Sequence, residues 1–280
     1  MEPLDWCRER LLVPGNPLSA SLLFLPAEQR DRVLVIRSLQ AEIAAMANPD
    51  SPPETLLPRL QWWRNAVTEV DNAHPVLRAL RAQQLNTPTL TESLDVLVNG
   101  VMTASGAPRF ESLAELKAFC FACGGAASQM EAAVLAAAVD GPEKDRCASD
   151  WRGLGATAYL LRLVRDLGID ARYQRWFVPL DLQADFQVSR AEVAEGQHSR
   201  RFDGLVRTLV AEAFKWSQAC LADKPGREQL VQRHLLIQWA LDQRLGRQLV
   251  RRPASVLSER VLPGHAGNVW VAWRAARRLR

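Results

Sequence analysis

Two aspartates, Asp166 and Asp170, stand four residues apart in a segment rich in leucine and arginine. On a helix this spacing places both carboxylates on one face. Arg165, Arg172 and Arg175 lie close to them in the sequence. Carboxylate oxygens are the ligands that Mg²⁺ prefers and arginines grip phosphate oxygens, so the pattern suits a magnesium–diphosphate site. The same spacing is common on solvated helix faces that carry ion pairs, and the motif alone does not separate the two interpretations.

Other reactive residues give weaker signals. Cys120 and Cys123 have the spacing of a zinc or redox pair, but the sequence supplies neither a second pair nor a nearby histidine, and structural zinc needs about four ligands. Their apolar surroundings favour buried packing cysteines. His74 precedes a proline in a predicted turn, where we expect a capping role. Walker, dinucleotide-binding and nucleophile-elbow motifs do not occur in the sequence.

Charge is distributed unevenly along the 280 residues. Residues 1–140 contain 11 Lys and Arg against 16 Asp and Glu, whereas residues 141–280 contain 24 against 15. The second half is therefore strongly basic, which indicates an anionic partner: a phosphorylated substrate, an acidic protein, a lipid surface or nucleic acid. With 48% hydrophobic and 24% charged residues, the composition is that of a globular protein and excludes global disorder.

The elements that position these residues are predicted to be helices, because alanine, leucine, arginine and glutamine dominate and β-branched runs are scarce. Val33, Ile36, Ile43 and Met46, for example, recur at spacings typical of one apolar helix face. The sequence predicts one all-α domain over residues 1–280. The expected helices cover residues 28–47, 56–70, 76–85, 116–139, 146–170, 205–221 and 227–250.

Local signals mark where some of these helices begin or bend. Residues 89–92 and 112–115 resemble capping boxes, each with a hydroxyl residue followed three positions later by glutamate. The glycine pair at 124–125 is expected to permit close packing or a kink. Adjacent Trp62 and Trp63 point about 100° apart on a helix, so we expect one in the core and the other at its rim.

The last residues, about 266–280, form a basic tail. Trp270 and Trp273 are three residues apart and share a helix face, and Arg274, Arg277, Arg278 and Arg280 follow without any acid. Such a segment can lie on an anionic membrane surface, dock a protein partner, or form a solvated end. No recognised nucleic-acid module accompanies the charge, so nucleic acid is not an expected partner. Five scattered cysteines and the lack of an apolar leader predict a cytoplasmic protein, with peripheral membrane contact through the tail as an option.

Several motifs occur in a familiar order. Leu22 to Pro26 are followed by Arg30, and a tryptophan-containing segment at 60–64 is followed by His-Pro-Val at 74–76. The strongest match covers residues 155–179 and ends in Arg-Trp-Phe-Val-Pro at 175–179. From about residue 16 to 249 the chain resembles the squalene/phytoene synthase family of head-to-head prenyl transferases. The resemblance implies an all-α isoprenoid-synthase-like bundle with a central cavity.

In active members of that family, two acidic motifs on facing helices bind Mg²⁺, which neutralises the diphosphate as it leaves an allylic carbon. The resemblance places the first motif here at about residues 40–46, where Glu42 is the only acid and Ala44 and Ala45 replace aspartates. Asp50 lies beyond an Asn-Pro pair and is expected off the helix. The first acidic motif is therefore almost abolished.

The second motif is only partly kept. Asp166 and Asp170 remain, but Ile169 stands where the family has an acid. Tyr159 and Arg162 replace a glutamine and an asparagine that face the cavity in the family. An arginine at 162 is expected to fill part of the cavity or to pair with Asp166.

Two interpretations follow from the resemblance. The sequence favours a degenerate member similar to the assembly factors of respiratory complex I, which binds a protein, a lipid or a prenyl chain without catalysis. The alternative is a Mg²⁺-dependent prenyl transferase that condenses prenyl diphosphates. In that case Asp166 and Asp170 would bind Mg²⁺, and the substrate would contact Arg165, Arg172, Arg175, Tyr159, Arg162 and Glu42.

Overall fold

The computed structural model describes residues 1–13, 16–47, 53–69, 71–106, 108–139, 141 and 146–279. Within these ranges the chain forms helices and no strand, which confirms the all-α prediction. The first half contains α1 (Pro3–Leu11), α2 (Pro17–Leu22), α3 (Ala27–Ala44), the 3₁₀ turn η1 (Ala45–Ala47), α4 (Pro53–Ala66), α5 (Pro75–Ala82), α6 (Pro88–Ser105), α7 (Leu113–Cys120), the π-helical turn η2 (Phe121–Gly125) and α8 (Ala126–Ala136). The second half contains α10 (Arg152–Arg172), α11 (Leu180–Phe186), α12 (Arg190–Ala194), α13 (Arg200–Leu221), α14 (Gly226–Val231), α15 (Arg233–Arg251), α16 (Ser255–Ser258) and α17 (His265–Arg278).

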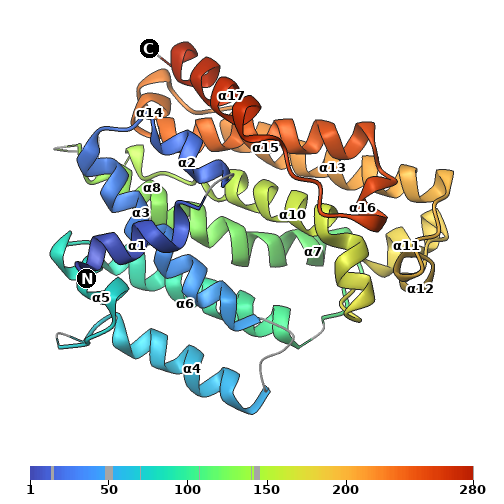
Figure 1. Cartoon of the computed structure of the whole chain (residues 1–280), viewed down its shortest axis with the longest axis horizontal. Coiled ribbons are helices and arrows are strands. Elements are labelled where there is room, and N and C mark those ends of the chain that lie inside the picture. The colour runs from blue at the N-terminus through green and yellow to red at the C-terminus, as the bar shows by residue number, and fades with distance from the viewer. Residues whose placement is uncertain are drawn as a thin grey trace.

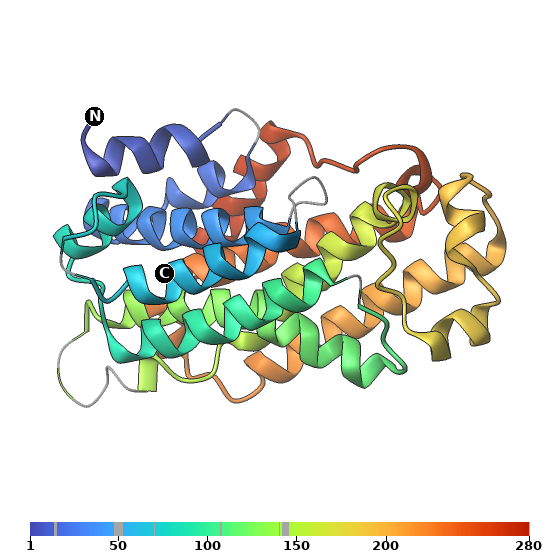
Figure 2. The same ribbon diagram turned by 90° about the horizontal axis from the view of Figure 1, so that it is seen from below.

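Helix α10 lies in the middle of the bundle (Figure 1). It packs against η2, α13, α15 and α16, and its apolar side forms the centre of one hydrophobic core. A second core joins α3 to α4, α5, α6 and α8. The short helices α11 and α12 close one end of the bundle (Figure 2). The predicted Asp-x-x-x-Asp motif thus stands on the most enclosed helix of the fold.

A contact between two glycines brings α10 close to the π-helical turn η2. A Cβ on Gly124 would lie 2.1 Å from the carbonyl oxygen of Gly155, and a Cβ on Gly155 would lie 1.9 Å from the carbonyl oxygen of Gly124. Neither position can hold a larger residue without moving backbone. Gly124 is also part of the π-helical turn that interrupts the predicted 116–139 helix. The expectation of close packing or a bend at this pair is confirmed.

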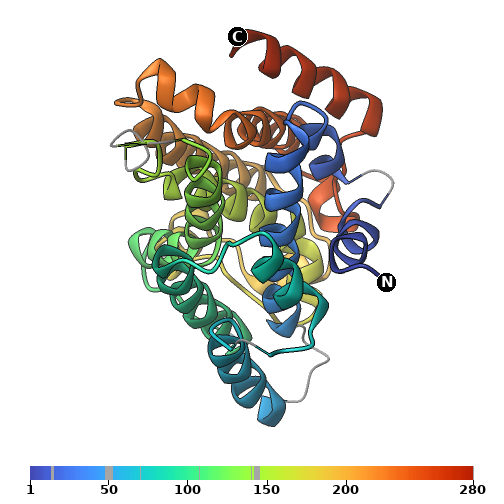
Figure 3. The ribbon, with the colours of Figure 1, turned by 90° about the vertical axis from the view of Figure 1, so that its left-hand side faces the viewer.

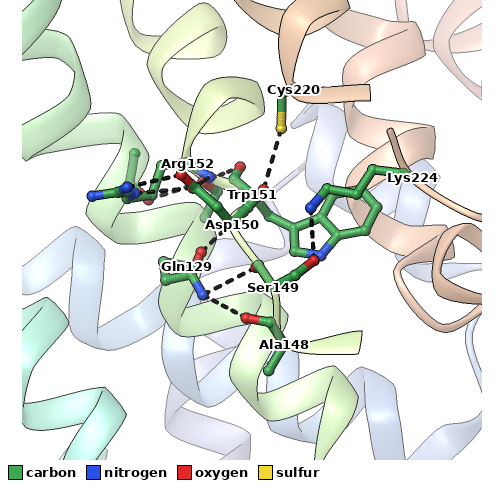
Figure 4. A network of polar contacts seen from close by, with 10 residues as sticks. Gln129, Ala148, Ser149, Asp150, Trp151, Arg152, Cys220 and Lys224 are labelled. Carbon is green, nitrogen blue, oxygen red and sulfur yellow. Dashed lines mark hydrogen bonds and ion pairs between the residues drawn. The ribbon is translucent and has the colours of Figure 1, made fainter. Parts of the chain in front are cut away.

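Polar contacts fix the beginning of α10 (Figure 4). The Gln129 side chain donates to the carbonyl of Ala148 at 2.8 Å and accepts from the Trp151 backbone N–H at 3.0 Å. The Lys224 ammonium donates to the Ser149 hydroxyl at 2.6 Å and stands 5.1 Å from the Trp151 ring centre. Helix α8 and the turn after α13, through these residues, therefore set the position of α10.

Several local predictions are confirmed. His74 caps α5 by accepting from the Val76 N–H at 3.3 Å. Trp63 is buried, whereas Trp62 is 41% exposed at the rim. Ser112 caps α7 by accepting from the Glu115 N–H, although the Glu115 carboxylate binds the backbone of residue 111 rather than that of Ser112.

Two local predictions are wrong. The residue that caps α6 is Thr87, which accepts from the Leu90 N–H at 3.2 Å, because Pro88 already occupies the first helical position. The single helix expected over 227–250 is two helices, α14 and α15, which meet at Gln232. Of the three alternatives left open for the tail, the solvated frayed end is excluded, because α17 packs against α15 and α2.

One helical stretch, Leu113–Ala136, is long and apolar enough to cross a membrane. Its most apolar window is 67% buried among other helices. This burial is the property of a core helix in a globular bundle.

Candidate functional site

One face of α10 carries the predicted site residues. Tyr159, Arg162, Asp166 and Asp170 recur at three- and four-residue spacings, so their side chains point to the same side of the helix. The residues between them, such as Leu163 and the glycine at 168, are buried against other helices. The prediction that Asp166 and Asp170 lie on one face of a helix is confirmed.

Both oxygens of Asp166 are held by arginines. The Arg165 guanidinium donates to Asp166 Oδ1 at 2.8 Å and to Oδ2 at 2.6 Å. Arg260, from the segment after α16, donates to Oδ1 at 2.9 Å. The Asp166 side chain is only 16% exposed. A cation would have to displace two arginines to reach this carboxylate.

Asp170 is neutralised less completely. Its closest ion pair is with Arg175, whose Nε lies 3.4 Å from Asp170 Oδ1. The pKa of Asp170 is raised to about 6, chiefly by burial. Arg175 opposes this rise, and the charge of nearby Asp166 adds to it. Arg175 also donates to the carbonyl of Ala47 at 3.4 Å, so it links the end of α10 to the end of α3 and η1.

One side of α3 carries Arg37, Ala41 and Ala44. Arg37 points into the protein, where its Nε lies 2.6 Å from the fully buried Glu131 carboxylate of α8. Ala41 and Ala44 are exposed, as is Ala45 in η1. The end of α3 therefore presents methyl groups to solvent on this side, and it has no carboxylate there.

Charged groups of α3, α10 and α15 act on one another inside the bundle. Arg162 is exposed to solvent, yet burial by the surrounding protein lowers its pKa, while Asp242 of α15 opposes this shift. Burial likewise raises the pKa of Asp242 to about 6, against the lowering effect of Arg162 and Arg37. Arg162 also lies 5.5 Å from the ring centre of Tyr159. Asp242 is thus the acid that most offsets the desolvation of Arg162, and the ion pair with Asp166, one of the two roles expected for Arg162, is not formed.

Tyr159 belongs to an apolar environment rather than to the acidic cluster. Its ring meets Phe119 edge to face at 5.6 Å between ring centres, and burial raises the pKa of its hydroxyl well above the ordinary value. Burial also raises the pKa of Cys123 to about 12. Cys120 and Cys123 are buried free thiols, so the packing role predicted for this pair is confirmed.

Two predicted substrate residues lie elsewhere. The Arg172 guanidinium donates to the carbonyl of Leu257 at 2.8 Å, so it holds α16 and the segment that carries Arg260. Glu42 turns toward α1, where its carboxylate pairs with Arg10 at 2.8 Å. The structure therefore brings together Asp166, Asp170, Arg165 and Arg175, but it does not bring Arg172 or Glu42 to them.

The described residues do not fit a magnesium–diphosphate site with two acidic walls. No group of three or more His, Cys, Asp or Glu side chains that could hold a metal ion is found among them. Mg²⁺ prefers several oxygen ligands in an octahedral arrangement, and here the α10 wall offers one carboxylate already held by two arginines and one with a single longer ion pair. Asp50 lies outside the described residues.

Sequence reasoning missed Arg260, Asp242 and Arg37. Arg260 is 94 residues from its partner Asp166, and nothing local in the sequence links the two. Asp242 did carry a signal, because it falls between buried Leu241 and Leu245 near the apolar side of α15. An acid at such a position indicates a buried partner of opposite charge.

A pocket of about 510 Å³ lies at the end of α15. Arg260 borders it, and the other lining residues come from the end of α15 and from α16 with the following segment: Gln248, Arg251, Arg252, Ser255, Glu259, Val261 and Leu262. This pocket is outside the Asp166–Asp170 face and carries mainly basic groups.

Comparisons with known proteins agree on one family. The family model described as squalene/phytoene synthase matches residues 15–265. A phytoene synthase from Arthrospira platensis is 24% identical over 229 residues, which cover 76% of this chain and 72% of that protein.

Solved structures support the same fold. A dehydrosqualene synthase in complex with a ligand superposes with a TM-score of 0.80 at 16% identity, covering 99% of this chain and 96% of that one. The squalene synthase HpnC from Alicyclobacillus acidocaldarius gives a TM-score of 0.67 at 14% identity, covering 90% and 94%. The predicted isoprenoid-synthase-like helical fold is therefore confirmed.

Proposed function

The chain belongs to the squalene/phytoene synthase family, and from this premise we propose that it is a non-catalytic member that acts by binding, as an assembly-type factor. The observation that carries the proposal is the set of alanines at the end of α3. Ala41, Ala44 and Ala45 stand, exposed, where the resemblance to the family places the carboxylates of its first acidic motif. A methyl group cannot bind Mg²⁺, and a diphosphate cannot leave an allylic carbon without neutralisation of its charge.

The charge of the opposite wall supports the same proposal. Arg165, Arg175 and Arg260 stand at the two aspartates and offset their negative charge. A site that concentrates Mg²⁺ needs an excess of carboxylates over cationic side chains. Among the described residues, three arginines stand against the two carboxylates of α10, so a divalent cation gains little by binding there.

The charges inside the bundle bear on the nature of the partner. A pocket for a prenyl chain is lined mainly by apolar side chains, whereas Arg162, Asp242 and Arg37 are close enough inside this bundle to shift one another's pKa. Covering these charges with a hydrocarbon chain would add to their desolvation. We therefore favour a protein partner over a prenyl chain or a free lipid as the molecule that this fold binds.

One observation favours the alternative, a Mg²⁺-dependent prenyl transferase. Asp170 is a largely buried carboxyl with a single ion pair at 3.4 Å, and its raised pKa reflects incomplete neutralisation. A bound cation would relieve this desolvation. Asp170 is therefore the residue on which any remaining metal binding would depend.

A pyrophosphate-release assay with farnesyl and geranylgeranyl diphosphate, with and without Mg²⁺, separates the two functions. We expect no release above the rate without protein, while the Arthrospira platensis phytoene synthase serves as the active control. Release by this chain that is lost in Asp170→Asn would overturn the proposal. Asp185→Asn, at a surface helix away from α10, is the matched variant that should behave as the native protein in either case.

Thermal unfolding supplies a second test. Mg²⁺ with farnesyl diphosphate should leave the Tm unchanged if the chain does not assemble a metal–diphosphate site. A Tm increase that requires both Mg²⁺ and the diphosphate, and that Asp166→Ala abolishes, would support the transferase instead. A shift produced by the diphosphate without Mg²⁺ would be ordinary anion binding by the arginines and would leave the non-catalytic proposal standing.

A further inference from the structure

Helix α17 presents an outer face built from two tryptophan–arginine pairs. Trp270 is 54% exposed and Trp273 is 43% exposed. The Arg274 guanidinium stands 4.7 Å from the Trp270 ring centre, and that of Arg277 stands 4.9 Å from the Trp273 ring centre. Each pair joins residues four positions apart, so the four side chains form one continuous patch, named here the tryptophan–arginine face.

The opposite face of α17 is fixed to the bundle. Ala272 and Ala276 are buried against Ile237 and Leu241 of α15 and Ala20 of α2. The Arg244 guanidinium of α15 donates to Asn268 Oδ1 at 2.6 Å, and Arg233 donates to the carbonyl of Ala276 at 2.9 Å. The helix is therefore already formed, and a partner of its outer face need not order it.

The tryptophan–arginine face is at the outside of the molecule. Figures 1 and 3 show α17 as the outermost helix on its side, with α15 and α2 beneath it and no other ribbon over it. The segment that leads into α17 adds Leu262, which is 69% exposed. No Asp or Glu occurs in α17, so its outer face has positive charge only.

We infer that the tryptophan–arginine face docks on an anionic phospholipid surface. Indole rings favour the boundary between headgroups and acyl chains, because they are apolar with one polar N–H. Arginines stacked on these rings reach the phosphate level while their aliphatic parts cover the indoles. Charge selects the occupant: an uncharged apolar partner would leave both guanidiniums without counter-charge, whereas a phosphate-rich surface satisfies them. The inference rests on α17 alone and does not depend on the proposed function.

Vesicle sedimentation tests this inference on the full chain. We expect binding to vesicles that contain phosphatidylglycerol, weak or no binding to phosphatidylcholine alone, and loss of binding at high salt. Each arginine near an anionic surface strengthens binding about fivefold, so the double variant Arg274→Gln, Arg277→Gln should bind about 25-fold more weakly. The double variant Trp270→Ala, Trp273→Ala should also bind more weakly, and native tryptophan fluorescence should shift to the blue on binding only when these two residues are present.

Trp62→Ala is the matched control, because Trp62 is 41% exposed on α4, a different part of the surface. Circular dichroism checks that each variant keeps its helices. Equal binding to neutral and anionic vesicles would overturn the inference, as would equal loss of binding in Trp62→Ala and in the α17 variants. If sedimentation velocity instead shows a dimer that the Trp270→Ala, Trp273→Ala variant dissociates, the face is an interface between two copies and the membrane assignment is wrong.

Discussion

Replacing Glu131 by glutamine should destabilise the protein strongly and with a characteristic pH dependence. Glu131 is fully buried on α8, and its carboxylate binds both Arg37 of α3 and His234 Nδ1 of α15. His234 Nε2 in turn lies 2.9 Å from the Ser21 hydroxyl of α2. This network joins four helices and fixes the Arg37 side chain inside the bundle.

The magnitude follows from the pKa of Glu131. Burial alone would raise it, but Arg37 and His234 outweigh burial and lower it from 4.5 to about 2. A difference of about 2.5 pKa units corresponds to about 3 kcal/mol of folding free energy. Because the folded-state pKa is the lower one, this stability is fully present above about pH 4.5 and is lost as the pH falls toward 2.

Urea unfolding followed by circular dichroism measures the effect. At neutral pH, Glu131→Gln should lower the free energy of unfolding by about 3 kcal/mol, because Arg37 and His234 lose their buried counter-charge. The difference from the native protein should shrink as the pH falls below about 4.5. Glu28→Gln, which removes an exposed i,i+4 pair with Arg32, should cost no more than about 0.5 kcal/mol at any pH. A stability of Glu131→Gln equal to native at neutral pH, or a difference that does not change with pH, would refute the reasoning.

Two further predictions concern α10. Gly124→Ala should destabilise the protein by about 3 kcal/mol or prevent folding, because its Cβ would lie 2.1 Å from the Gly155 carbonyl oxygen. Gly226→Ala is the control, because a Cβ at that position meets nothing within 4 Å. Similar unfolding midpoints for the two variants would contradict the close helix contact. The second prediction concerns Asp170, whose pKa in the folded state is raised from 3.8 to about 6. Its ionisation therefore costs stability as the pH rises through this range. Asp170→Asn should be about 1–3 kcal/mol more stable than the native protein at neutral pH, with no gain in stability below about pH 4. The pKa of about 6 already includes the opposing effect of Arg175, and a variant less stable than native at neutral pH would show that this ion pair outweighs desolvation.

The fold could be predicted from the sequence because its determinants are local. Apolar periodicity located α3, α10 and α13, and the glycine pair at 124–125 predicted the close crossing of α10. Errors arose where two signals competed. Thr89 and Glu92 match a capping box, but Thr87 followed by Pro88 is the stronger start because proline prefers the first helical turn.

The candidate site was predictable only along α10. Helical spacing placed Asp166 and Asp170 together. Arg260, which pairs with Asp166, comes from a segment far along the chain, and no local sequence pattern predicts where that segment folds back. Helical geometry did contain the answer for Glu42. Glu42 follows Arg37 by five residues, and this spacing places it about 140° around the helix from the Arg37 side of α3. Its carboxylate accordingly binds Arg10 of α1.

The alanines of α3 and the arginines around α10 are two aspects of one electrostatic state. With carboxylates at positions 41 and 44, cations would be needed to offset them, and Mg²⁺ could serve. Without those carboxylates, two aspartates on α10 would remain as partly buried charges, which is costly unless they are paired. Arg165 and Arg260 at Asp166, and Arg175 at Asp170, supply that pairing from the protein itself. Restoring a single aspartate on α3 should therefore not restore metal binding, because the arginines would neutralise it first; both walls would have to change together.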